Sequence, residues 1–312
     1  MHIPDNFLSP PVWATLDGLA IPAVAYVSRK AQQATDSNRI PMLGVVGAFV
    51  FAAQMINFPV GLGTSGHLVG GTLLACIVGP WPAALVITSI LIVQALVFQD
   101  GGVLALGANV VNMALMGVLF GYLPARAFFH TKWKFRGIFL GGFCSVLVSG
   151  VLALAELTLS GIRMHASLLG ISLGLFAINA ILEGAITVSV LRAIERLTPG
   201  IADGLCKAAV ALPGSSRWPA PIAALAAGSL VLAAGGILVA STSPDGLEHV
   251  AQSLGMPFTS HTFSSPLGNY TIQALGPTWF SRAAAGIAGL VLVYLICTVG
   301  GRLLARARRS YS

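Results

Sequence analysis

The most informative shortages in this 312-residue chain are those of charge and of enzyme motifs. Only 9% of the residues are charged, whereas soluble domains carry about 25%, so the composition argues against a soluble protein. The sequence has no Gly-x-x-x-x-Gly-Lys-Ser/Thr phosphate loop, which indicates that the chain is not itself an ATPase. It also has no two histidines four residues apart, which argues against an intramembrane metalloenzyme.

The chain has few cysteines and no recognisable signal peptide. The four cysteines are Cys76, Cys144, Cys206 and Cys297. No two of them have the spacing of a metal or redox motif, so we predict no disulfide framework. A secretory signal is missing too, because no basic region and no apolar run precede Pro4. We therefore expect Met1, with its free α-amine, to be the mature N-terminus.

Long apolar stretches make up most of the chain, of which 56% is apolar. A bilayer core needs roughly 20 apolar residues per helix, so the pattern predicts an all-α polytopic membrane protein. The expected spans are residues 11–28, 40–58, 68–79, 81–98, 103–125, 137–159, 167–191, 219–240 and 279–301. The span at 68–79 is too short to cross without local adjustment.

Lysine and arginine are distributed unevenly enough to predict the orientation. If the N-terminus is outside and residues 68–79 count as a short crossing, there are nine crossings, and 15 of the 17 basic residues face the cytoplasm. Only Arg163 and Arg282 then lie outside. We expect a multi-pass protein of the bacterial cytoplasmic (inner) membrane, whose net charge of +7 serves topology in a lipid bilayer and not nucleic-acid binding.

The segment Met-His-Ile-Pro-Asp at the start carries the clearest chemistry. The α-amine of Met1, the amide of His2 and the Nδ1 atom of His2 can close two adjacent chelate rings in one plane. Square-planar nitrogen sets suit Ni²⁺ or Cu²⁺. His67 follows a glycine-rich loop on the same predicted side and is the candidate for the fourth nitrogen. The alternative is a frayed terminus without a ligand role. The other histidines of the expected outer loops, for which no role is predicted, are His165, His249 and His261.

Polar side chains inside the apolar spans form a second group of candidates. They are Gln54, Asn57, Gln94, Asn109, Asn112, Glu156, Asn179 and Glu183. Such groups are costly in hydrocarbon and usually face a cavity or a partner. Asn109 and Asn112 share a helix face, and we weigh a cavity role against interhelical hydrogen bonding. For Asn179 we favour interhelical hydrogen bonding, and for Glu183 a paired position. The residues expected around the metal site or its cavity are Asn109, Asn112, Gln94 and Asp5.

Several of these motifs occur together in one known family. They are Met1-His2-Ile3-Pro4-Asp5, Phe7-Leu8-Ser9-Pro10, Gly66-His67-Leu68-Val69-Gly70-Gly71, Leu106-Gly107-Ala108-Asn109 and Asn112-Met113-Ala114. The chain thereby resembles, over about residues 1–200, the CbiM/NikM family of substrate-binding membrane (S) subunits of cobalt and nickel energy-coupling-factor (ECF) transporters. The resemblance implies that Met1, His2 and His67 hold the metal. Asn6 stands where the family usually has glycine, and since Asn tolerates left-handed backbone, the turn is expected to survive.

The second half of the chain resembles a separate subunit of the same systems. Pro244-Asp245-Gly246-Leu247-Glu248 is similar to the PDGLE motif of the small NikN/CbiN-like auxiliary subunit. We therefore expect a seven-helix S-component core at 1–200, a cytoplasmic linker at 201–218, and an auxiliary part at 219–312 with two helices and an outer loop at 244–278. Because every expected ligand precedes residue 68, we expect the first part to bind metal on its own.

The resemblance also implies a mechanism and partners. The subunit would bind a divalent transition metal at the outer face, Ni²⁺ in preference to Co²⁺, and would carry no prosthetic group. A transmembrane coupling (T) subunit and two cytoplasmic ATPase subunits would then drive its release inward. A metal channel stays open as an alternative, although the polar residues are sparse for a pore. An intramembrane metalloenzyme is the least favoured alternative.

Overall fold

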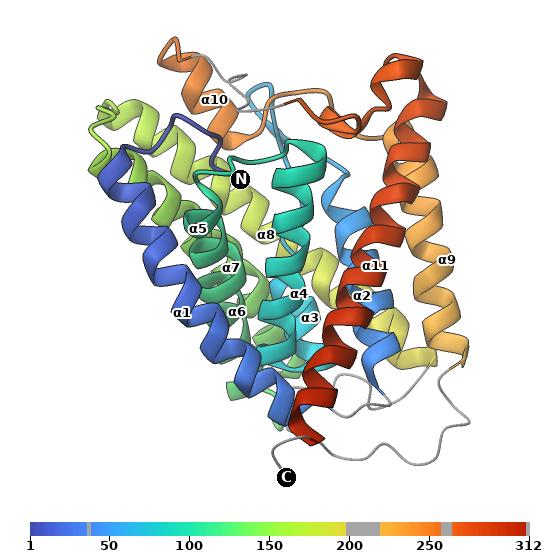
Figure 1. Ribbon diagram of the computed structural model, residues 1–312. Helices are drawn as coiled ribbons and strands as arrows, with labels where there is room; N and C mark the ends of the chain where they lie inside the picture. Colours follow the sequence, from blue (N-terminus) through green and yellow to red (C-terminus); the bar gives the residue numbers. More distant parts are fainter. Residues whose placement is uncertain (36–38, 198–218, 257–263, 310–312) are drawn as a thin grey trace.

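The computed structural model describes residues 1–35, 39–197, 219–256 and 264–309 (Figure 1). The predicted linker at 201–218 falls outside these ranges, and so do Cys206 and His261. The core helices are α1 (Pro10–Ala34), α2 (Ile40–Gln54), α3 (Gly71–Val78), α4 (Pro80–Val93) with the π-helical turn η2 (Gln94–Phe98), α5 (Leu106–Asn109) with η3 (Val110–Gly117) and α6 (Val118–Ala127), α7 (Lys134–Leu159) and α8 (Ala166–Leu197). The auxiliary part contains α9 (Pro219–Gly235), η5 (Gly236–Leu238), α10 (Gly246–Ser253), η6 (Gly268–Tyr270), η7 (Gln273–Leu275) and α11 (Trp279–Arg309).

Among the residues that the structure describes, five stretches of helix are long and apolar enough to cross a bilayer. They are Pro80–Phe98, Leu106–Ala127, Lys134–Leu159, Ala166–Leu197 and Trp279–Arg306. Two shorter apolar helices, Ile40–Gln54 and Ile222–Gly235, stand beside them. The chain is therefore a multi-pass membrane protein, as the apolar pattern predicts. The helix predicted at 40–58 ends earlier, at Gln54, and residues from Phe58 onward form a strand.

The helices stand roughly side by side, with α9 and α11 along one flank of the core and α10 across its end (Figure 1). α1 packs against α4 and α5, and α7 packs against both α6 and α8. α9 and α11 pack against each other and against α2. Met1, the strands and α10 lie at one end, which we call the upper end, and α11 runs from there to the other end.

A hairpin forms where the sequence suggests only a glycine-rich loop. β1 (Phe58–Gly61) pairs antiparallel with β2 (Thr64–Gly66). The turn between them uses positive φ at Gly61 and Gly63, which glycine adopts without strain. His67 follows directly after Gly66, the last residue of β2. The hairpin therefore sets the position at which His67 enters the bundle.

The chain between β2 and α3 enters the bundle without regular structure, and the predicted short crossing is shorter still. α3 has eight residues, of which Gly71 to Ile77 are buried. Gly70 precedes it at φ 76°, and a Cβ there would lie 2.5 Å from Val50. This position thus requires glycine for its backbone conformation and for space. Residues 67–70 are buried and connect the hairpin to α3.

Candidate metal centre

The first three residues are inserted into the upper end of the bundle instead of fraying. Met1 and His2 are each 5% exposed and Ile3 is fully buried. Asn6 has φ 67°, so the left-handed turn expected at this position is present. The N-terminal segment is therefore packed as part of the core, and its main-chain nitrogens have fixed surroundings.

Asn109 holds this segment in place through both main-chain polar atoms of Ile3. The Ile3 amide donates to Asn109 Oδ1 at 2.8 Å, and Asn109 Nδ2 donates to the Ile3 carbonyl at 3.0 Å. The Gly102 amide donates to the same carbonyl at 2.8 Å. Asp5 adds a further contact, because its Oδ1 accepts from the Leu104 amide at 2.8 Å. The structure thus brings two of the predicted cavity residues, Asn109 and Asp5, to the N-terminus.

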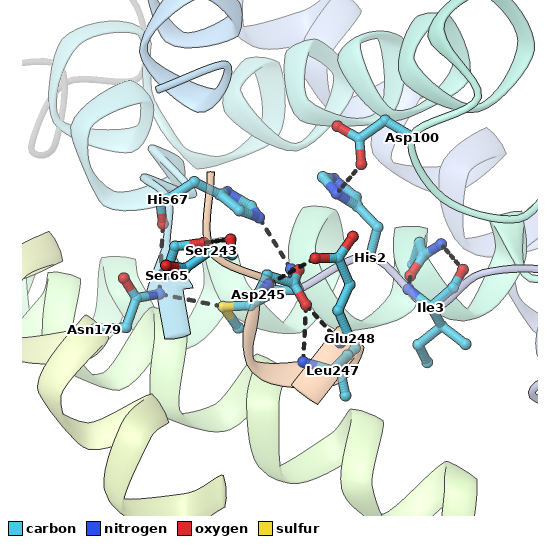
Figure 2. A network of polar contacts seen from close by, with 12 residues as sticks. His2, Ile3, Ser65, His67, Asp100, Asn179, Ser243, Asp245, Leu247 and Glu248 are labelled. Atoms are coloured by element: carbon cyan, nitrogen blue, oxygen red, sulfur yellow. Dashed lines mark hydrogen bonds and ion pairs between the residues drawn. The ribbon is translucent and has the colours of Figure 1, made fainter. Parts of the chain in front are cut away.

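The terminal amine contacts a histidine and a carboxylate, those of His67 and Asp245, which are both labelled in Figure 2. Its nitrogen is 3.0 Å from His67 Nε2, and it forms an ion pair with Asp245 Oδ2. The side chain of Met1 is held as well, because Asn179 Nδ2 lies 3.4 Å from its Sδ and 3.4 Å from the His67 carbonyl. The predicted partners Met1 and His67 are therefore neighbours, and Asn179 links them.

His67 presents a nitrogen suited to metal binding. Its Nδ1 lies 3.0 Å from the Leu68 carbonyl, which can only accept, so Nδ1 carries the proton and the lone pair of Nε2 faces the Met1 amine. Burial, together with the positive charge of that amine, lowers the pKa of His67 to about 3. The imidazole is consequently neutral near pH 7, and neutral imidazole is the form that binds metals.

His2 lies beside His67 but is engaged elsewhere. The two rings stack at 5.2 Å with an interplanar angle of 7°. His2 Nδ1 is 3.0 Å from Asp100 Oδ1, and the ring is turned toward that residue (Figure 2). His2 Nε2 is buried and has no hydrogen-bond partner among the described residues. The planar chelate predicted from the sequence therefore requires this imidazole to rotate away from Asp100.

Asp100 connects His2 to the auxiliary part. Its Oδ2 accepts from the Tyr270 hydroxyl at 2.5 Å. Burial alone would raise the pKa of Asp100, but the charge of His2 and the hydrogen bonds from His2 and Tyr270 hold this pKa below its usual range. The carboxylate therefore remains ionised next to the expected ligands.

A buried network shapes the chain that follows His67. Glu183 accepts from the Val69 amide at 2.7 Å and from the Gly70 amide at 2.9 Å. Gln54 Nε2 donates to the Val69 carbonyl at 2.8 Å, and Gln94 Nε2 donates to Gln54 Oε1 at 2.9 Å. Gln94 thus acts on the site through Gln54, while Glu183 is paired, as its position in a span predicts.

Asn112 does not join the site, although it shares a helix with Asn109. Its Nδ2 donates to Glu156 Oε2 at 2.8 Å, between η3 and α7. It is not among the residues that line the cavity beside His2. Of the two predictions weighed for this residue, interhelical hydrogen bonding is the one that the structure shows. His165 is exposed and His249 lies on α10, and neither lines that cavity.

The cavity at the upper end has a volume of about 330 Å³ and collects donors from both parts of the chain. Its lining includes His2, His67, Asp100, Asp245, Glu248 and Tyr270. Within the described ranges, no three His, Cys, Asp or Glu side chains are grouped to hold a metal by themselves. The predicted donor set is of another kind, because two of its four nitrogens belong to the main chain.

Sequence reasoning missed several residues that build this site. From the sequence, Asp100 is assigned to a turn, Asn179 to interhelical hydrogen bonding, and Tyr270 to a long loop. A signal existed for Asp100, because it directly follows a span on the same predicted side as His67. No local signal exists for Tyr270 or for the contact of Asp245 with Met1, since these contacts join residues 170 and 244 positions apart.

A helical membrane protein with an amine, two imidazoles and several carboxylates around one cavity has the donors of a metal-handling membrane protein. Residues 2–201 match the family described as CbiM, the cobalt uptake substrate-specific transmembrane region, and residues 220–306 match the PDGLE domain. The chain belongs to the CbiM family and carries a C-terminal PDGLE domain. The fused arrangement expected from the sequence is thereby confirmed.

Individual relatives agree with this assignment. The chain is 34% identical over 299 residues to a putative fused nickel transport protein, NikMN, of Archaeoglobus fulgidus, covering 94% of this chain and 95% of that protein. It is 40% identical over 171 residues to a probable fused nickel transport protein, LarMN, of Lactiplantibacillus plantarum, covering 54% and 52%. A solved structure described as a truncated transition metal transporter superposes with a TM-score of 0.56 at 32% identity, covering 63% of this chain and 99% of the other.

Proposed function

We propose that this protein is the substrate-specific subunit of an ECF-type, ATP-driven importer of Ni²⁺ or Co²⁺. The observation that carries the proposal is the buried Met1 amine, 3.0 Å from His67 Nε2, with His2 stacked beside His67. The names of the relatives support a nickel or cobalt substrate. The upper end then faces the outside, which agrees with the distribution of basic residues.

The proposed donors are four nitrogens: the Met1 amine, the His2 amide, His2 Nδ1 and His67 Nε2. The Met1 ammonium and the His2 amide would each release a proton when the metal binds. Metal binding would draw His2 Nδ1 away from Asp100, while His67 already presents Nε2 toward the amine. A planar set of nitrogens suits Ni²⁺ better than Co²⁺, and we therefore favour nickel as the substrate. The metal here is the transported substrate and not a resident cofactor.

Energy for release would come from other proteins. The chain has no phosphate loop of its own, so we assign ATP hydrolysis to two cytoplasmic ATPase subunits and its transmission to a transmembrane coupling subunit. Delivery inward then means opening the upper-end site toward the other end of the bundle. We propose the bacterial cytoplasmic (inner) membrane as the location in which this importer works.

The direct test is binding of Ni²⁺ to the purified full-length chain and to His67→Ala. We expect the variant to lose tight binding while it still inserts into the membrane, because one of four nitrogens is removed. His165→Ala is the matched control, since His165 is exposed and does not line the cavity. Unchanged, stoichiometric nickel binding by His67→Ala would rule out the proposed site.

A further inference from the structure

The PDGLE motif is docked on the core directly beside the proposed metal ligands. The Ser65 amide donates to the Pro244 carbonyl at 2.8 Å, and Ser65 Oγ donates to the Ser243 carbonyl at 2.7 Å. Ser65 and Asp245 also form a parallel bridge, so the motif extends the hairpin edge two residues before His67. Figure 2 shows Ser65, Ser243 and Asp245 together at this point.

The rest of the motif fits closely against α8. Gly246 is buried, and a Cβ at this position would lie 2.9 Å from the Phe176 ring. Leu247, Val250 and Ala251 form the buried face of α10. Burial of these apolar groups holds the motif on the core by the hydrophobic effect, so its position does not depend on the ion pair with Met1.

The carboxylate of Asp245 is divided between two tasks. Oδ1 accepts from the Leu247 amide at 2.8 Å and from the Glu248 amide at 2.9 Å, which caps α10. Glu248 Oε2 accepts from the Asp245 amide at 2.8 Å, and this completes a capping box. Oδ2 remains for the terminal amine. The helix therefore fixes the orientation of the carboxylate that contacts Met1.

We infer that Asp245 is a positioning residue of the metal centre, through which the PDGLE motif seats the Met1 amine against His67. The inference rests on the proposed function, because it concerns the same amine. A chain terminus is ordinarily poorly ordered, and the ordering of a ligand before the metal arrives improves binding. The PDGLE motif performs this ordering from the auxiliary part of the same chain.

Two charge-removing variants of the motif separate this role from others. Asp245→Asn removes the ion pair with Met1 but keeps a good N-cap, because Asn caps helices as well as Asp. Glu248→Gln is the matched control, because it removes one negative charge from the same cavity and Gln also completes a capping box. Asp245→Ser, which also caps, serves if Asp245→Asn does not fold.

Titration of the purified full-length proteins with Ni²⁺ alone gives the first result. We expect Asp245→Asn to bind about 10–100-fold more weakly than the wild type, the usual effect of losing a group that orients a ligand. Glu248→Gln should lose clearly less affinity than Asp245→Asn, since it leaves the amine contact intact. Equal losses in both variants, or no loss in Asp245→Asn, would overturn the inference.

Two further measurements distinguish positioning from other roles. In the metal-free protein, an amine-acylating reagent should modify the Met1 amine faster in Asp245→Asn than in Glu248→Gln. At saturating Co²⁺, the visible spectrum of Asp245→Asn should match that of the wild type, and a changed spectrum would make Asp245 a ligand instead. If the wild type and His67→Ala bind nickel equally, the proposed function fails. If only His67→Ala loses binding and Asp245→Asn does not, the inference alone fails.

Discussion

The core and the auxiliary part contact the same N-terminus in different ways. From the core, Asn109 and Gly102 bind the main chain of Ile3 through neutral hydrogen bonds, and His67 offers a neutral nitrogen to the amine. From the auxiliary part, Asp245 contributes a negative charge at the amine. The core thus holds the main chain of Ile3, and the auxiliary part holds the terminal amine through a charged contact.

This difference matters because removing one partner has different costs for a buried ion pair and for a buried neutral hydrogen bond. Burial by itself would raise the pKa of Asp245, but the Met1 amine lowers it overall, so the carboxylate stays ionised. Removal of one partner of a buried ion pair leaves an uncompensated charge, which is more costly than the pair itself is stabilising. The contact of Asp245 with Met1 is therefore weak evidence for a contribution to stability.

The largest expected effect comes from a change at the amine that both parts contact. One glycine added before Met1 converts the amine into a peptide nitrogen and places new atoms in a close-packed region. We expect nickel binding to be abolished, measured by titration, whereas the same glycine added after Ser312 should have no effect. Equal affinities in the two proteins would mean that Met1 is not a ligand, and a channel, which needs no free amine, would gain support.

The contribution of the core can be isolated with a pair of asparagines. Asn109→Ala removes two hydrogen bonds to Ile3, which at about 1 kcal/mol or more each corresponds to roughly a 30-fold or greater loss of nickel affinity. Asn112→Ala is the control, because Asn112 is equally buried but binds Glu156. Both variants should lower thermal stability, and only the first should weaken binding. A similar loss of affinity in both would indicate general unfolding of the bundle.

The contribution of the auxiliary part can be isolated by truncation. A protein that ends at residue 218 keeps every proposed ligand but loses Asp245 and Tyr270. The sequence alone predicts unimpaired binding, whereas the contact of Asp245 with the amine predicts affinity about 10–100-fold lower. Nickel titration of the truncated and full-length proteins decides between these expectations, and equal affinities would favour the first.

The smallest expected effect is on the stability of the metal-free protein in acid. The pKa of His67 is about 3 in the folded protein and near 6.5 in an unfolded chain, so the unfolded state binds the proton more readily. Stability should therefore fall as the pH drops from about 6 to 4, by roughly 1 kcal/mol per pH unit. His67→Gln should reduce this slope in denaturation experiments in detergent, and an unchanged slope would contradict a buried neutral His67.

Much of the architecture follows from local sequence properties. Runs of apolar residues identify the helices because each span must bury its backbone polar groups in its own hydrogen bonds within a bilayer. Proline and glycine mark several of their ends, as at Gly79 and Pro80. The β hairpin was not predicted, because its glycine-rich strands resemble a loop. The position of Asn109 in an apolar span indicated that this residue has a specific role. The sequence could not show that its hydrogen-bond partner is Ile3.

The sequence by itself determined the class of protein and the order of its helices, and it indicated Met1 and His2 as candidate ligands. These properties depend on residues that are close together in the sequence, so they can be predicted from the sequence alone. Only the tertiary structure decided which side chains surround Met1, because His67 and Asp245 reach its amine, and Asn179 its sulfur, from separate parts of the chain. It also distinguished Asn109 from Asn112, which lie three residues apart. The packing of all the helices sets such contacts, and no local pattern records that packing.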